Sequence, residues 1–265
     1  MHQHDQGLSL DLPTLLSRRR LLGLLGAAGA ATIAGCSSTS EPGSDPGPPA
    51  AARDSTADGE IPEETAGPYP GDGSNGVDVL TESGIVRSDI TRSFGTGSAV
   101  ATGVPLTIAL TVLDVGNGGG RPLAGAAVYL WHCDQQGRYS LYSQGVEQEN
   151  YLRGVQVADD AGKVSFTSVY PAAYDGRWPH IHFEVYATLE KATTASDKLR
   201  TSQLALPEDT STKVYATSGY EQSVRNMGKT SLETDMVFSD GYSLQLGTVS
   251  GDVSSGLTVT LAVPV

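Results

Sequence analysis

The stretch Leu106-Thr107-Ile108-Ala109-Leu110-Thr111-Val112 alternates between apolar side chains and small or polar ones. A second stretch near the end of the chain, Leu257-Thr258-Val259-Thr260-Leu261-Ala262-Val263, repeats this pattern. Successive side chains of a β-strand point to opposite faces, so both stretches are expected to be strands with one buried face. Three further strands are expected between them, each bounded by turns rich in Gly, Pro or Asp, at residues 126–133, 163–170 and 181–186.

Helical patterns are few, and are expected only at residues 189–199 and for a turn or two around residues 221–227. Many short strands separated by turns indicate an all-β fold, a β-sandwich with long functional loops and few short helices. The 32 glycines and 14 prolines among 265 residues fit this class and are too many for a helix bundle.

The chain is acidic, with a net charge of −13 from 17 Lys and Arg against 30 Asp and Glu. So few cations leave no basic surface to neutralise phosphates, and a nucleic-acid partner is therefore not expected. The same balance argues against binding to an anionic membrane surface and favours small uncharged or cationic ligands. The oligomeric state stays open, with a homo-oligomer as one alternative.

Residues 1–35 are expected to be an export signal. Ser17-Arg18-Arg19-Arg20 precedes an apolar run at residues 21–34, a succession typical of such signals. The arginine pair resembles a twin-arginine signal, and Ile33-Ala34-Gly35-Cys36 resembles a lipoprotein box, in which the Cys36 sulfur is acylated. The protein would then be an exported lipoprotein at the cell surface or the periplasmic side, held to the membrane only through Cys36. The alternative is an ordinary secretory signal, with Cys36 incidental.

Residues 36–60 contain no Val, Ile, Leu, Met, Phe, Trp or Tyr and are rich in Ser, Pro, Gly and Asp. Such a segment cannot bury enough surface to offset its ordering entropy, so it is expected to be a disordered tether. The folded domain is then expected to span residues 61–265. It retains three of the five histidines, at positions 132, 180 and 182.

Two of these histidines form the pattern His180-Ile181-His182, directly after Pro179. On a strand the two imidazoles share one face, while Ile181 and its alternate neighbours face the core. Such a pair can bind one metal ion, but a structural pair is equally compatible with the residues alone.

Tyrosine is the other candidate metal ligand, with 11 Tyr against 4 Phe. Tyr139 and Tyr174 each follow an expected strand, so both belong to loops. A phenolate is a hard anionic ligand suited to Fe(III). Copper or zinc is an alternative, although structural zinc favours Cys and His ligands. Each tyrosine could also simply be an aromatic side chain that caps the sandwich.

Four segments are considered together: Gly137-Arg138-Tyr139, Tyr170-Pro171-Ala172-Ala173-Tyr174, Arg177-x-x-His180-x-His182 and Thr65-Ala66-Gly67-Pro68-Tyr69. With their order Tyr…Tyr…His-x-His, they resemble the intradiol ring-cleavage dioxygenase family, the group of protocatechuate and catechol dioxygenases. The resemblance extends over residues 61–265.

The resemblance implies an Fe(III) enzyme that cleaves catechol-like aromatic diols with O₂ to muconate-type dicarboxylates. It implies that Tyr174 is the ligand that leaves when the diol chelates the metal, and that Arg177 stabilises negative charge on the bound ring. The residues implied to bind the metal are Tyr139, Tyr174, His180 and His182. The residues implied to bind substrate are Gln203, Pro68 and Tyr69.

The chain also departs from the family pattern. Only Asp175 and Gly176 separate Tyr174 from Arg177, where the catabolic enzymes have a longer insertion, so a more open site for bulkier substrates is expected. The helical N-terminal region of catechol-type members has no counterpart. A competing hypothesis is therefore a non-catalytic cell-surface β-sandwich that binds a partner and keeps a relic metal site.

Overall fold

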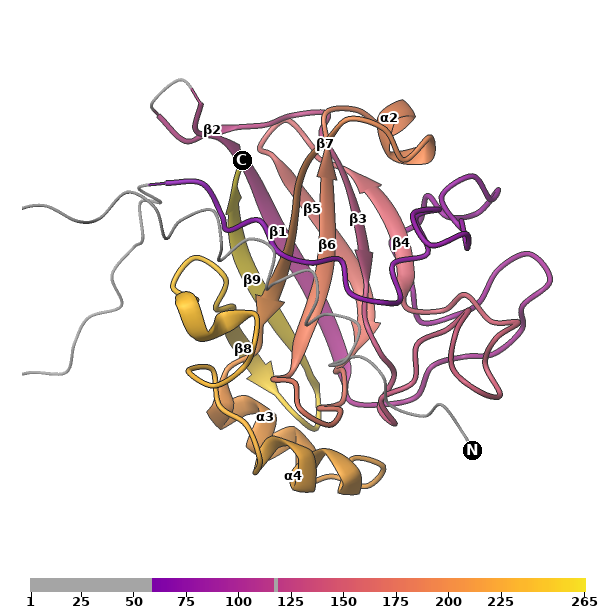
Figure 1. Ribbon diagram of the computed structural model, residues 1–265, viewed down its shortest axis with the longest axis vertical. Helices are drawn as coiled ribbons and strands as arrows, with labels where there is room; N and C mark the ends of the chain where they lie inside the picture. Colours follow the sequence, from indigo (N-terminus) through magenta and orange to yellow (C-terminus); the bar gives the residue numbers. More distant parts are fainter. Residues whose placement is uncertain (1–58, 117–118) are drawn as a thin grey trace, which may run out of the picture.

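The first of two β-sheets is built around β1 (Pro105–Asp114), the strand predicted from the alternating apolar pattern (Figure 1). On one side β1 pairs antiparallel with β5 (Lys163–Val169) and, at its end, with β2 (Arg121–Pro122). On the other side it pairs in parallel with β9 (Gly256–Pro264), which pairs antiparallel with β8 (Thr248–Asp252).

The computed structural model describes residues 59–116 and 119–265. The export signal, Cys36 and nearly all of the expected tether lie outside the described residues.

The second sheet has the strand order β4 (Arg153–Val157), β3 (Ala127–Trp131), β6 (His180–Tyr186) and β7 (Lys198–Ala205). Its neighbouring strands all pair antiparallel. The register places Trp131 of β3 opposite His182 of β6.

The main core lies between the two sheets and is made by the alternating apolar residues of both. It includes Ile108 and Val259 from the first sheet and Phe183 from the second, each 0% exposed. The prediction of an all-β sandwich is confirmed. Tyr186 and the two histidines of β6 fall on the opposite face of their strand from Phe183, as the alternation requires.

The second sheet is buried on its outer face as well, because the chain that precedes β1 crosses it (Figure 1). Every residue of β3 and of β6 is buried. We call the described chain before β1, residues 59–104, the covering segment. Its Val79 and Leu80 join Tyr129 and Trp131 in a second apolar cluster on this face. The outer face therefore forms a second interior, where polar side chains can be held away from water.

Four short helical segments complete the described residues. They are α2 (Leu189–Thr193), α3 (Glu208–Tyr215), α4 (Glu221–Met227) and the 3-10 turn η1 (Phe238–Asp240). The predicted helix at residues 189–199 is too long, because Ala195 and Asp197 have positive φ and β7 begins directly after them. In the described part of the chain, no helix has the length and apolar character needed to cross a membrane.

Candidate metal centre

His180 and His182 lie side by side on the outer face of β6, with their Nε2 atoms 3.1 Å apart. Each side chain is 2% exposed. Burial lowers the pKa of both imidazoles well below the ordinary value of 6.5, and the positive charge of Arg177 adds to this effect at His180. Both rings are therefore neutral near pH 7, the form in which an imidazole nitrogen can bind a metal.

Neighbouring groups set the orientation of both rings. His180 Nδ1 is 2.5 Å from the carbonyl oxygen of Trp178, which can only accept, so Nδ1 carries the proton and the lone pair is on Nε2. The His182 ring stacks on Trp131, with centroids 5.0 Å apart and planes 5° apart. The two Nε2 atoms consequently point to the same place.

Two phenols complete the group. Tyr174 Oη lies 3.1 Å from His180 Nε2, and Tyr139 Oη lies 3.5 Å from Tyr174 Oη. Ligand atoms that share one ion at bond lengths of about 2 Å lie about 3 Å apart, so this set fits a single metal ion. Burial raises the pKa of the Tyr139 phenol well above its ordinary value of 10.0. A highly charged cation would counter that shift and favour the phenolate.

The loop that carries Tyr139 is fixed by a buried cation, Arg153 of β4, which is 1% exposed. Its guanidinium donates to Ser140 Oγ at 3.1 Å and to the Ser140 carbonyl at 3.0 Å. It also donates to the carbonyls of Tyr69 at 2.9 Å and Pro70 at 2.8 Å. One side chain thus ties the covering segment to the residue next to Tyr139.

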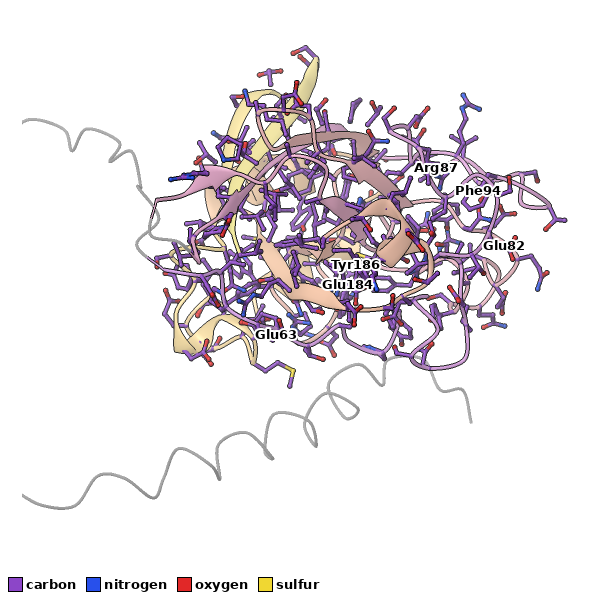
Figure 2. All side chains as sticks on the ribbon, turned by 90° about the horizontal axis from the view of Figure 1, so that it is seen from above. Glu63, Glu82, Arg87, Phe94, Glu184 and Tyr186 are labelled. Carbon is purple, nitrogen blue, oxygen red and sulfur yellow. The ribbon has the colours of Figure 1, made fainter. Side chains whose placement is uncertain are left out.

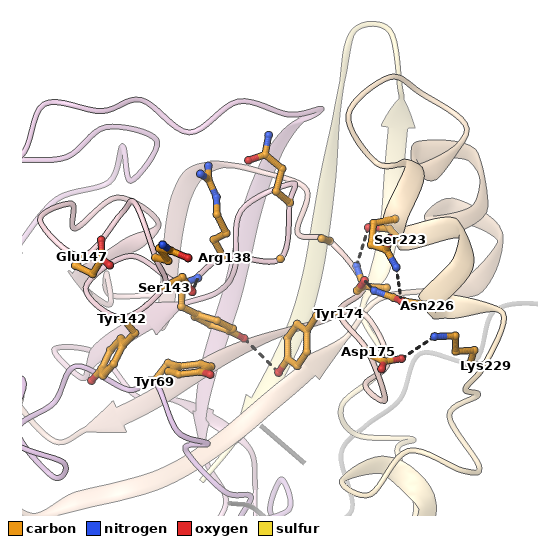
Figure 3. Close-up of a pocket in the computed structure, with 17 residues that line it drawn as sticks. Tyr69, Arg138, Tyr142, Ser143, Glu147, Tyr174, Asp175, Ser223, Asn226 and Lys229 are labelled. Atoms are coloured by element: carbon orange, nitrogen blue, oxygen red, sulfur yellow. Dashed lines mark hydrogen bonds and ion pairs between the residues drawn. The ribbon is translucent and has the colours of Figure 1, made fainter. Parts of the chain in front are cut away.

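The loop that carries Tyr174 is held by helix α4. Ser223 Oγ accepts from the Ala173 amide at 3.1 Å, and Asn226 Nδ2 donates to the Ala173 carbonyl at 2.9 Å. On the other side of the tyrosine, Lys229 forms an ion pair with Asp175 at 3.0 Å (Figure 3). Tyr174 itself is only half-buried, whereas Tyr139 is 2% exposed.

Comparison with known proteins identifies the family. The dioxygenase family model (Dioxygenase_C) matches residues 81–211, which include all four predicted ligands. A solved structure of an intradiol ring-cleavage dioxygenase from Tetranychus urticae is similar, with 25% sequence identity and a TM-score of 0.56. That similarity covers 69% of this chain and 87% of the other. The chain belongs to the intradiol ring-cleavage dioxygenase family.

Two curated relatives agree with this assignment. The chain is 35% identical over 85 residues to a catechol 1,2-dioxygenase of Candida albicans, covering 30% of this chain and 28% of the relative. It is 28% identical over 92 residues to a chlorocatechol 1,2-dioxygenase of Rhodococcus opacus, covering 31% of this chain and 36% of the relative. The chain therefore matches only about a third of the length of these two intradiol dioxygenases.

In this member of the intradiol family, Arg177 lies behind the donor set. Its side chain is almost fully buried, with Nε 2.9 Å from Asp235 Oδ2 and Nη2 2.7 Å from Gln203 Oε1. Gln203 is 0% exposed, and its Nε2 donates to the Thr65 carbonyl at 2.9 Å. The structure therefore brings Arg177 and Gln203 together, while neither lines the cavity beside the donors.

That cavity has a volume of about 710 Å³ and is lined by Tyr139, Tyr174 and Tyr69 among others (Figure 3). Of the predicted substrate residues, only Tyr69 reaches it; Pro68 does not line it. Gly67, directly before Pro68, has a φ of +71°, and a Cβ built there would lie 3.4 Å from His182 Cε1. The Thr65–Tyr69 segment thus covers an imidazole as well as reaching the cavity.

Sequence reasoning missed three groups of this site: Arg153, Asp235 and the α4 residues Ser223 and Asn226. Asp235 carries a local indication, because its Oδ1 accepts from the Val237 amide at 2.8 Å, two residues along the chain. The contacts that matter for the site are distant in sequence, however: 84 positions separate Arg153 from Tyr69.

Past the histidines, the outer face of β6 carries Glu184 and Tyr186, which lie next to each other in Figure 2. Tyr186 Oη donates to Glu184 Oε2 at 2.6 Å, and Lys198 Nζ donates to Glu184 Oε1 at 2.7 Å. Both carboxylate oxygens of Glu184 therefore accept hydrogen bonds from neighbouring side chains. In the described residues, no group of three or more His, Cys, Asp or Glu side chains is placed to hold a metal.

Proposed function

We propose that this protein is a non-haem Fe(III)-dependent intradiol dioxygenase that cleaves catechol-like aromatic diols with O₂ to muconate-type dicarboxylates. The observation that carries the proposal is the continuous set Tyr139–Tyr174–His180–His182, whose successive donor atoms are 3.5, 3.1 and 3.1 Å apart. Two neutral imidazoles and two phenols suit a hard ferric ion. A non-catalytic binding protein has no need of this set, and nothing in the described residues favours that alternative.

The roles that we assign to the four ligands follow from how exposed each side chain is. Tyr174 lines the cavity and is the more exposed phenol. With the ferric ion bound, its Oη would be a phenolate and would accept the proton of an incoming diol hydroxyl. Tyr139, His180 and His182 are buried and stay in place. The Arg177 guanidinium, fixed by Asp235 and Gln203, adds positive charge behind the imidazoles and stabilises the anionic diol. When bound, ferric iron supplies the activation of the chelated diol toward O₂.

The proposal is tested by loading the full chain with iron and recording its visible spectrum before and after addition of catechol. We expect a reddish phenolate-to-iron absorption that shifts with catechol, followed in the presence of O₂ by a ring-opened dicarboxylate that mass spectrometry detects. Iron-loaded protein that stays colourless and leaves catechol intact would refute the proposal.

We also propose that the protein is exported and anchored through an acylated Cys36, on the basis of the residue 17–36 pattern. In a host that processes bacterial lipoproteins, Cys36→Ser is expected to move the protein from the detergent phase to the aqueous phase on phase partitioning. Mass spectrometry should show the loss of a lipid-sized mass at the N-terminus. Identical partitioning of wild type and variant would contradict the anchor.

A further inference from the structure

The cavity beside the candidate metal centre is much larger than one diol ring requires. Its volume is about 710 Å³, whereas a cavity of about 150 Å³ is enough to hold benzene. Of the four donors, Tyr139 and Tyr174 line one part of its wall, so most of the space is available to whatever extends from the reacting ring.

One wall of this space is aromatic. The Tyr69 ring lies 4.9 Å from the Tyr139 ring and 5.2 Å from the Tyr142 ring, measured between centroids. Tyr142, Tyr69 and Tyr174 follow one another along the cavity in Figure 3, with Ser223 and Asn226 of helix α4 beyond Tyr174. We call Tyr69 and Tyr142 the tyrosine shelf; both are half-buried and both line the cavity.

The tyrosine shelf is held rigidly from behind. Tyr142 Oη accepts from the Gly71 amide at 2.8 Å and donates to Asn75 Oδ1 at 2.9 Å. The Arg153 guanidinium carbon is 5.4 Å from the Tyr142 ring centroid. A rigid aromatic side chain loses little entropy when a ligand stacks on it, which makes it an effective contact.

The charged side chains around the cavity do not favour an ionised extension. The two cations among its described lining residues are already paired, Lys229 with Asp175 at 3.0 Å and Arg138 with Asp134 at 2.8 Å. A carboxylate on the ligand would have to compete with these partners. The shelf offers an uncharged aromatic group a direct contact instead.

We propose that the tyrosine shelf is a subsite for a second, uncharged aromatic ring, so that the preferred substrates are catechols that carry an aryl substituent. This inference rests on the proposed function for the identity of the first ring. The position of the shelf next to Tyr139 places the second ring within one or two ring lengths of the donors.

The test compares 4-phenylcatechol with catechol in wild type, Tyr142→Ala and Tyr142→Phe. Both variants lose the hydroxyl contacts to Gly71 and Asn75, and only Tyr142→Phe keeps the ring, so any general loosening of the loop is common to both. Calorimetry on the metal-free protein measures affinity, and iron-loaded protein supplies the ratio of kcat/KM for the two diols.

Wild type should prefer 4-phenylcatechol by about five- to tenfold in affinity, a preference that Tyr142→Phe keeps and Tyr142→Ala loses. The ratio of kcat/KM should change in the same way. A preference equal in wild type and Tyr142→Ala, or absent from wild type, would overturn the subsite. If the binding contrast holds while iron-loaded protein cleaves neither diol, the proposed function fails and the aromatic subsite stands.

Discussion

Tyr139→Phe is expected to lower iron affinity by more than about 100-fold, because loss of an outer-shell partner alone typically costs 10–100-fold and this change removes a direct ligand. The variant should still fold. Without metal, burial keeps the Tyr139 phenol neutral, and its hydroxyl lies 3.5 Å from Tyr174 Oη, at the limit of a hydrogen bond. Iron content after desalting and the visible spectrum measure the first effect, and urea unfolding of the metal-free protein measures the second.

Tyr186→Phe is the matched control for this change. Tyr186 is equally buried on the outer face of β6, but its hydroxyl donates to Glu184 and takes no part in the donor set. It should lose stability and keep its iron, the opposite of Tyr139→Phe. Iron retention and colour that survive in Tyr139→Phe would refute the assignment of this phenol as a ligand.

Asp235→Ala is expected to lower the free energy of unfolding by about 3–5 kcal/mol, the range for removing one partner of a buried ion pair. The Asp235 side chain is 0% exposed and that of Arg177 is 2% exposed, so the buried guanidinium would lose its carboxylate partner. The carboxylate also accepts from the Trp178 amide at 2.7 Å, two residues before His180. Urea denaturation of the metal-free protein measures the loss.

The exposed ion pair Lys229–Asp175 provides the comparison for this prediction. Its side chains are 58% and 54% exposed, and Asp175→Ala should cost less than about 1 kcal/mol. Equal losses in the two variants would show that burial of Arg177 and Asp235 does not determine the strength of their interaction.

The sandwich was predictable mainly from β1, β5 and β9, whose burial alternates along the strand. Leu106 and Leu257 begin two such patterns, and both are buried in the core between the sheets. Helix α4 also appears where it was expected. Helix α3 was missed, although Pro207 followed by Glu208 and Asp209 is a recognisable helix start.

The four candidate ligands could be proposed from residue type and order, because the positions of His180 and His182 on one strand fix their common face. The residues that hold these ligands in place could not be predicted from the sequence. Arg177 contacts Asp235 across 58 positions, and Arg153 contacts Pro70 across 83. No local pattern records such pairings, since they follow from how the covering segment and the loop between α4 and η1 pack against the rest of the fold.

The most direct test of the central claim is an anomalous-scattering map at the iron edge, from crystals of the iron-loaded protein. We expect one peak at bonding distance, about 2 Å, from the Tyr139 and Tyr174 hydroxyl oxygens and the Nε2 atoms of His180 and His182. A peak at any other position, in protein that contains one iron per chain, would contradict the central claim.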